Sequence, residues 1–142
     1  MKKLKYVLFL VVVISMFVLT ACAAKPTEEP SEDKPVPADY AGKKNPVTGQ
    51  ADAITAGKQI FADNCATCHG EKGKGDGPGG AALNPKPADL SEVATDDEDD
   101  RINWVIHEGG EASGYSKDMK PFKGVLTDDE IWQVVAFIRT LK

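Results

Sequence analysis

Two thiols and an imidazole stand together in the segment Cys65-Ala66-Thr67-Cys68-His69. Cysteines separated by two residues can form a redox-active pair or supply half of a zinc site. A histidine directly after the second cysteine is typical of haem attachment, in which two thioether bonds hold the macrocycle and the histidine meets the iron from one face. The same five residues therefore allow three chemistries, which their surroundings distinguish.

The surroundings of the motif favour covalent haem. A thioredoxin-like pair follows a strand in a βαβ unit, and the sequence indicates no such strand before Cys65. A four-ligand zinc site needs further ligands, but His107 is the one other histidine of the chain. We therefore expect one haem c, bound through Cys65 and Cys68, with His69 as an axial ligand of the iron.

Three helices and no convincing strand are predicted around this motif, so the fold class is all-α. The first helix spans about residues 55–65 and ends in the motif. The second begins at Thr95, where Thr95-Asp96-Asp97-Glu98 fits a capping box. The third follows a second capping box, Thr127-Asp128-Asp129-Glu130, and carries apolar residues at helical spacing.

A long loop, residues 70–87, is expected between the first two helices. Its segment Gly75-Asp76-Gly77-Pro78-Gly79-Gly80 fits the dinucleotide pattern G-x-G-x-x-G, but it comes after a haem motif and no strand, which favours a flexible loop. Short helices and a long loop give a thin core for a domain of about 90 residues. A prosthetic group is thus expected to fill the centre.

The first 22 residues are predicted to be an export signal. Three lysines precede an apolar stretch over residues 6–19. The signal ends in Leu19-Thr20-Ala21-Cys22, which resembles the lipobox of bacterial lipoproteins, in which the cysteine receives a diacylglyceryl group and becomes the new N-terminus. The alternative is an uncleaved transmembrane helix over residues 6–24. Either way the rest of the chain is expected outside the cytoplasmic membrane, with Cys22 as its lipid anchor in the first case.

Residues 23–50 differ in composition from residues 51–142. They contain five of the nine prolines, mixed with charged and small residues, and offer almost no large apolar side chain to bury. We therefore expect a solvated, disordered tether, followed by one folded domain over residues 51–142.

Charge and length exclude two classes of protein. The chain has 17 basic and 22 acidic residues, a net charge of −5, and loss of the three signal lysines would leave −8. Such a body lacks the basic face that nucleic acid binding requires. A chain of 142 residues is also too short for a large two-domain enzyme.

The domain over residues 51–142 resembles the class I monohaem cytochromes c of the small bacterial type. The haem motif closes the first helix, Gly57 and Phe61 fit positions of that helix, and Phe137 fits the aromatic residue of the last helix. The resemblance implies a cytochrome c fold, with three main helices and long loops around one covalently bound haem. It also implies an axial methionine in the loop before the last helix, where Met119 lies.

Met119 is the predicted sixth ligand, because both other methionines lie in the signal. Its soft thioether would stabilise ferrous iron and raise the reduction potential. His107 is the alternative, but it lies near the end of the second predicted helix, where the helix dipole favours an imidazole without any metal. The resemblance further implies that a proline carbonyl, of Pro85 or Pro87, accepts a hydrogen bond from Nδ1 of His69.

The expected function is one-electron transfer without conversion of a substrate, by a lipid-anchored monomer on the outer face of the cytoplasmic membrane, or in the periplasm of a two-membrane bacterium. Expected partners are redox proteins such as a quinol-oxidising complex, a terminal oxidase or a reductase. Two alternatives are a haem c subunit of a larger membrane oxidoreductase and a gas- or peroxide-reactive haem protein. Five lysines near the motif and Met119 form either a basic rim that steers an acidic partner or an ordinary mixed surface: Lys72, Lys74, Lys117, Lys120 and Lys123.

Overall fold

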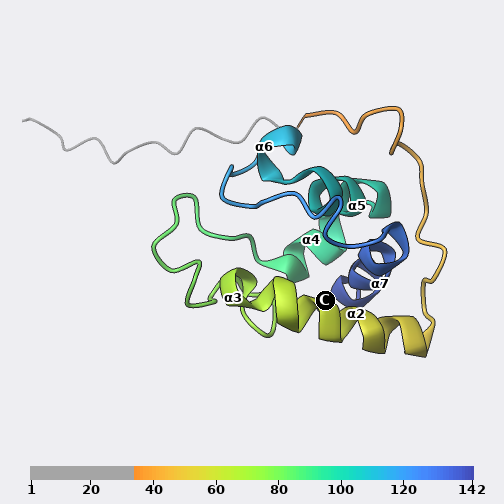
Figure 1. The fold of residues 1–142 in the computed structure, drawn as a ribbon, viewed down its shortest axis with the longest axis horizontal. Helices are drawn as coiled ribbons and strands as arrows, with labels where there is room; N and C mark the ends of the chain where they lie inside the picture. The colour runs from red at the N-terminus through yellow and green to blue at the C-terminus, as the bar shows by residue number, and fades with distance from the viewer. Residues whose placement is uncertain (1–33) are drawn as a thin grey trace, which may run out of the picture.

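The computed structural model describes residues 34–142, so the predicted signal and Cys22 lie outside the described residues. The described part is helical, and its helices pack together, joined by long loops (Figure 1). In chain order the helices are α2 (Ala51–Asn64), α3 (Ala66–His69), α4 (Leu90–Asp96), α5 (Asp99–Glu108), α6 (Gly110–Ser113) and α7 (Asp128–Ile138). No helix within residues 34–142 is long and apolar enough to cross a membrane. The predicted all-α fold is confirmed.

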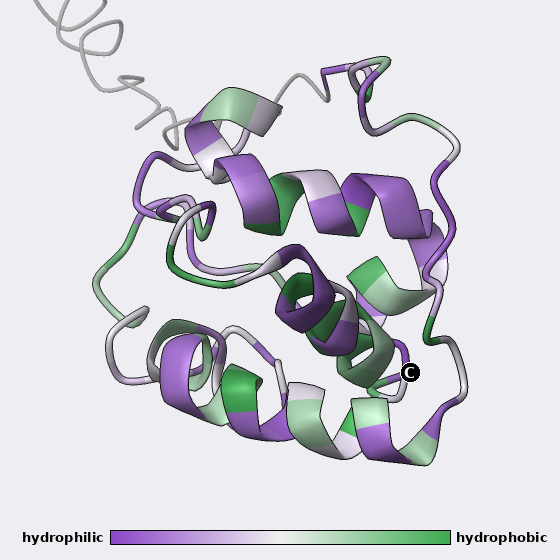
Figure 2. Ribbon diagram, turned by 45° about the vertical axis from the view of Figure 1, so that its right-hand side comes forward, coloured by the Kyte–Doolittle hydropathy of each residue, from purple (hydrophilic) through white to green (hydrophobic). Residues whose placement is uncertain are grey.

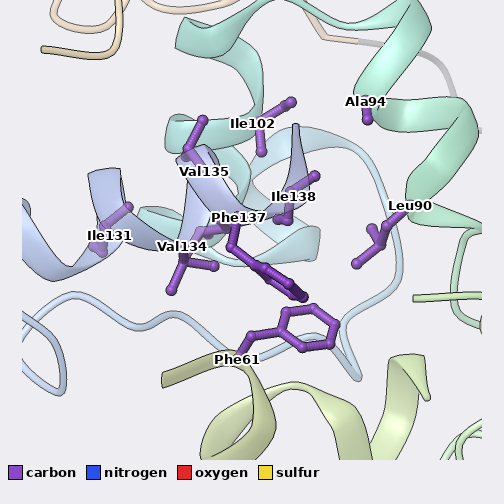
Figure 3. Close-up of a cluster of buried hydrophobic side chains, with 10 residues drawn as sticks. Phe61, Leu90, Ala94, Ile102, Ile131, Val134, Val135, Phe137 and Ile138 are labelled. Atoms are coloured by element: carbon purple, nitrogen blue, oxygen red, sulfur yellow. The ribbon is translucent and has the colours of Figure 1, made fainter. Parts of the chain in front are cut away.

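Helices α2 and α7 form the main contact of the fold (Figure 1). Gly57 permits their close approach, because a Cβ atom at this position would collide with the backbone carbonyl of Gln133. One turn further along α2, the rings of Phe61 and Phe137 meet with their centroids 5.1 Å apart (Figure 3). Both first-helix residues quoted for the family resemblance thus lie at this crossing.

The hydrophobic core lies where α7 is covered by the other helices. Figure 2 shows hydrophobic and hydrophilic residues on each of the longer helices, as expected for amphipathic helices that bury one face. Ile131, Val134 and Val135 of α7 are fully buried. The buried cluster also contains Phe61, Leu90, Ala94, Ile102, Ile106, Phe137 and Ile138.

The predicted start of the second helix at Thr95 is wrong. Asp89 caps an earlier helix, α4, by accepting a hydrogen bond from the backbone N–H of Ser91 (2.9 Å), and Thr95 donates to the Ser91 carbonyl inside that helix instead of capping the next one. A break follows α4 before α5 begins. Arg139 spans this break, donating to the carbonyl of Ala94 (2.7 Å) and to Asp99 (2.7 Å).

The predicted start of the last helix is confirmed. Thr127 accepts a hydrogen bond from the Glu130 backbone N–H, and the Glu130 carboxylate accepts one from the Thr127 N–H (2.8 Å). This reciprocal pair satisfies two N–H groups that have no partner within the helix. The capping box therefore ends the loop in front of α7 at a defined residue.

Residues 34–50, the described part of the predicted tether, are mostly exposed to solvent as expected, but they lie along the domain and contact it. This N-terminal strap (orange in Figure 1) runs from beside α6 along one side of the molecule to the start of α2. Asn45 is 7% exposed and donates to the carbonyl of Trp132 (2.9 Å). Polar contacts rather than large apolar side chains hold the strap, which is why its composition resembles that of a tether.

Candidate functional site

The cysteines and the histidine of the motif lie at the junction between α2 and α3. The backbone N–H of Cys65 still donates to the Phe61 carbonyl of α2 (2.8 Å), and the N–H of His69 donates to the Cys65 carbonyl (2.9 Å). Cys65 and Cys68 are half-buried free thiols. Because residues three apart on a helical turn share one face, both thiols are available to the same bound group.

The environment of Cys65 separates the three chemistries that the motif allows. Burial, and secondarily the neighbouring Cys68, raise the pKa of the Cys65 thiol to about 12. A redox-active pair and a zinc site both require a thiolate, which a low pKa favours. Residues 34–142 also contain no group of three histidine, cysteine or acidic side chains placed to hold a metal ion. The raised pKa of Cys65, together with the adjoining Cys68 and His69, fits covalent haem.

His69 is oriented by a backbone carbonyl, as expected, but the acceptor is Ala88. Nδ1 of His69 lies 3.3 Å from the Ala88 oxygen, so the prediction of Pro85 or Pro87 is wrong by one residue. Burial lowers the pKa of His69, and the bond to Ala88 opposes this shift in part. The neutral imidazole, with its proton on Nδ1, presents the Nε2 lone pair to a metal.

A glycine loop, residues 70–89, is bound to α3 by its backbone. The N–H groups of Gly77 and Gly79 donate to the carbonyls of Cys68 (3.2 Å) and Thr67 (2.8 Å). A Cβ at Gly77 would lie 2.5 Å from the Thr67 oxygen and 2.6 Å from the Ala66 oxygen. These glycines therefore serve close backbone approach to the haem motif, and not the loop flexibility predicted from the sequence.

Met119 lies in the loop between α6 and α7, here called the Met119 loop (residues 114–127). Its side chain is half-buried and contacts the hydrophobic core cluster. Its carbonyl accepts a hydrogen bond from the Gly110 N–H (2.9 Å), and a Cβ at Gly110 would lie 3.2 Å from the Met119 Cβ. The loop thus places the thioether at an apolar position, on a segment fixed to α6.

His107 takes part in a polar cluster. Its Nδ1 lies 2.8 Å from the hydroxyl oxygen of Tyr40, and its Nε2 lies 3.3 Å from Asp128. The Tyr40 hydroxyl donates its hydrogen to Glu108 (2.7 Å). Both ring nitrogens of His107 therefore have partners, which agrees with the structural role expected for it.

Sequence reasoning missed three contributors to these arrangements. Ala88 acts through its backbone, so no side-chain pattern could have indicated it. Tyr40 and Asn45 lie in a segment whose composition indicates a tether. A large aromatic residue in a proline-rich segment was the one available signal, because Tyr40 has apolar surface that is seldom left fully solvated.

Comparison with known proteins gives one family. The cytochrome c family model matches residues 54–142, more than half of the chain. Thiosulfate dehydrogenase of Stutzerimonas stutzeri (strain A1501) is 32% identical over 91 residues, which cover 61% of this chain and 27% of that protein. The cbb3-type cytochrome c oxidase subunit FixP of Rhizobium etli is 36% identical over 90 residues, 61% of this chain and 29% of that protein.

A shorter match has higher identity. The cbb3-type oxidase subunit CcoP of Rhodobacter capsulatus is 62% identical over 32 residues, 20% of this chain and 11% of that protein. The chain spans less than a third of the length of each of these relatives. The helical fold and the Cys65-Ala66-Thr67-Cys68-His69 motif agree with the family match, and the chain therefore belongs to the cytochrome c family, whose cofactor is covalently bound haem c.

Proposed function

We propose that the chain is a one-electron carrier whose haem is attached to Cys65 and Cys68 and ligated by His69 and Met119. The observation that carries this proposal is the turn at the junction of α2 and α3. It holds two free thiols and an imidazole whose Nδ1 is bound to the Ala88 carbonyl. The haem supplies the redox chemistry, by alternating between ferric and ferrous iron.

The protein's own residues determine how readily that change occurs. The bond from Nδ1 of His69 to Ala88 fixes the ring and increases the basicity of Nε2. A thioether from Met119 favours the ferrous state. Met119 and Phe122 contact the apolar core cluster, which keeps water and mobile dipoles away from one side of the site. With His69 and Met119 both as ligands, no position at the iron would remain for a substrate, so the chain is proposed to transfer electrons without being an enzyme.

Absorption spectra of the purified protein in both redox states test the site. The ferrous protein should show the bands of haem c after acid–acetone extraction, because the thioethers hold the haem. The ferric protein should show the weak red band of methionine-to-iron ligation. Extractable haem would overturn the attachment, and a missing red band in Met119→Leu and wild type alike would overturn the methionine ligand. Rapid CO binding to the untreated ferrous protein would instead favour the gas- or peroxide-reactive alternative.

We also propose that the protein is a lipoprotein on the extracytoplasmic face of the membrane. The lipobox-like segment Leu19-Thr20-Ala21-Cys22 supports this location, and the uncleaved helix over residues 6–24 is the alternative. Labelled fatty acid should be incorporated by the wild type and not by Cys22→Ser. A membrane-bound Cys22→Ser protein of unchanged size would favour the uncleaved helix.

Redox proteins are the proposed partners, among them a quinol-oxidising complex, a terminal oxidase or a reductase. Two of the relatives described above are named as subunits of a cbb3-type oxidase, which supports association with such a complex, and a monomeric carrier that docks transiently is the alternative. Purification in mild detergent distinguishes them, because a carrier is isolated alone and a subunit with its enzyme. Of the proposed basic rim, Lys74 pairs with Asp89 and Lys123 with Glu108, which reduces its net charge. Electron-transfer rates that do not change with ionic strength would contradict steering by this rim.

A further inference from the structure

The N-terminal strap, residues 34–50, is attached to the haem domain at several points. At its start, Lys34 donates to the Glu111 and Ala112 carbonyls of α6 (both 3.1 Å). Further along, the Gly42 N–H donates to Asp100 (2.6 Å) of α5. The family model begins at residue 54, so the strap is an addition to the matched domain. The strap is therefore placed to stabilise the parts of the domain that it contacts, α5 and α6.

The Met119 loop is held against the end of α5 by its backbone. The N–H groups of Phe122 and Lys123 donate to the carbonyls of Ile106 and His107 (both 3.0 Å). These two bonds lie a few residues after Met119 in the chain. The position of the thioether therefore depends on how firmly residues 122–123 stay on α5.

One strap residue, Tyr40, reaches this attachment. Its hydroxyl donates to Oε1 of Glu108 (2.7 Å), and the same oxygen accepts a hydrogen bond from the Lys123 ammonium (3.1 Å). Because the phenol hydrogen is donated to Glu108, the hydroxyl oxygen accepts from Nδ1–H of His107 (2.8 Å). Glu108 thus joins the strap to the Met119 loop through one carboxylate oxygen.

The contribution of Tyr40 is larger than that of the ion pair alone. The Lys123 side chain is 62% exposed, and an ion pair in such a position adds little by itself. The hydrogen bond from Tyr40 is short and charge-assisted, and it fixes the Glu108 carboxylate where Lys123 can reach it. Loss of the Tyr40 hydroxyl would remove the shortest contact of Glu108 Oε1 and leave this oxygen to Lys123 and to Nδ1 of His107, which lies 3.2 Å away.

We propose that Tyr40, Glu108 and Lys123 are positioning residues for the sixth iron ligand: the strap holds the Met119 loop on α5 and thereby protects methionine ligation. This inference rests on the proposed ligation by Met119. It predicts that an external ligand displaces the methionine more easily once the link is cut. Wild-type ferric protein must first show the red band, and its absence would refute the ligation itself.

Imidazole titration of the ferric holoprotein tests the link, with loss of the red band as the readout. Tyr40→Phe and Glu108→Ala should each increase the apparent affinity for imidazole by about fivefold, because each removes a hydrogen bond to a charged group. The double variant should bind imidazole no more tightly than Glu108→Ala alone, because Tyr40 acts on the Met119 loop through Glu108. Lys44→Gln is the matched control, because it removes an exposed strap contact, to Glu98, that has no connection to the Met119 loop.

Amide exchange gives a second readout that does not involve an external ligand. The Lys123 N–H should exchange faster in Tyr40→Phe, and at the wild-type rate in Lys44→Gln. The proposal would be overturned if Tyr40→Phe and Glu108→Ala, each showing the red band, bound imidazole and exchanged the Lys123 amide as the wild type does. An equal increase in Lys44→Gln would also overturn it, since the effect would then come from general loosening of the strap.

Discussion

The two sides of the proposed haem site are held in different ways. On the histidine side, the glycine loop is fixed to α3 by backbone hydrogen bonds from Gly77 and Gly79, between segments about ten residues apart in sequence. On the methionine side, the Met119 loop is held by α5, by α6 and, through Glu108, by the strap. Both loops are thus fixed to neighbouring helices by backbone contacts of similar sequence separation, and the methionine side alone adds a contact from a distant segment, the bond from Tyr40 to Glu108.

This difference shows how a carrier can combine a permanent attachment with an adjustable ligand. In the proposed site, thioether bonds would keep the haem attached on the histidine side through small changes in packing. The methionine would be bound only by coordination and would depend on several weak contacts, each worth about 1 kcal/mol. Changes on the first side should therefore reduce the stability of the whole domain, and changes on the second should first affect the ligand.

Gly77→Ala should strongly destabilise the histidine side. Its Cβ would meet the carbonyl oxygens of Thr67 and Ala66, which belong to the backbone of the motif and cannot rotate away. We expect the free energy of unfolding to fall by about 2–3 kcal/mol. Guanidinium denaturation followed by far-UV circular dichroism measures it.

Gly79→Ala is the matched control, because its Cβ would lie 2.8 Å from the Thr67 side-chain methyl, which can rotate, and 3.1 Å from the Thr67 backbone oxygen, farther than the 2.5 Å at Gly77. Its effect should be about 1 kcal/mol or less. Equal destabilisation by both substitutions would show that the loop is not fixed by backbone approach at Gly77.

Gly110→Ala should act on the methionine side. Its Cβ would collide with the Ser116 carbonyl and press on Met119, so the loop must shift. We expect a loss of about 1–2 kcal/mol in unfolding free energy together with a weakened red band. Spectra of Gly77→Ala under native conditions should keep that band. If the red band of Gly110→Ala were as strong as in wild type, changes on the methionine side would not affect the ligand first, and the two sides would not differ in this respect.

Thr127→Ala removes the cap that ends the Met119 loop. The Glu130 N–H loses its acceptor, and the free energy of unfolding should fall by about 1 kcal/mol. Thermal unfolding of the holoprotein measures it. Thr55→Ala, which removes a hydroxyl bonded only within α2, should leave the melting temperature nearly unchanged.

Acid should weaken the methionine side through Glu108. The hydrogen bond from Tyr40, and next the one from Lys123, lower the pKa of Glu108 below its ordinary value of 4.5. Because the pKa of Glu108 is lower in the folded state, the ionised carboxylate stabilises the fold fully at pH values above its ordinary pKa. This stabilisation is lost as the pH falls through the pKa of the folded state. The unfolding free energy measured from pH 6 to pH 3 should therefore fall more in wild type than in Glu108→Gln. If the unfolding free energy fell equally with pH in both proteins, the bonds from Tyr40 and Lys123 would not stabilise the Glu108 carboxylate.

Local features of the fold could be predicted from the sequence, and distant ones could not. The haem motif and the capping box at Thr127 each involve residues within four positions, so the pattern contains the whole interaction. The break between α4 and α5 depends on Arg139, which lies 40 residues from Asp99. No local pattern around Thr95 contains that information.

The strap was missed for a related reason. Burial of apolar side chains is the signal by which composition indicates folded structure, and the strap is held mainly by polar contacts of Asn45, Tyr40 and backbone groups. The acceptor for His69 was missed by one residue, since the path of the glycine loop places Ala88 next to the ring. Met119 lies in the loop before the last helix, as predicted, whereas His69 lies in α3, a short helix that the sequence did not predict.

If the chain is anchored at Cys22 as proposed, the strap would also limit the volume that the haem domain can search. With Cys22 as the proposed anchor, only 11 residues separate it from Lys34, where the strap meets α6. Fully extended, such a link spans at most about 40 Å, against about 100 Å for a tether that ran free to residue 51. A shorter link confines the carrier to a thin shell above the bilayer and raises its effective concentration for membrane-bound redox partners. Folding the strap onto the domain thus shortens the working distance of the carrier without shortening its chain.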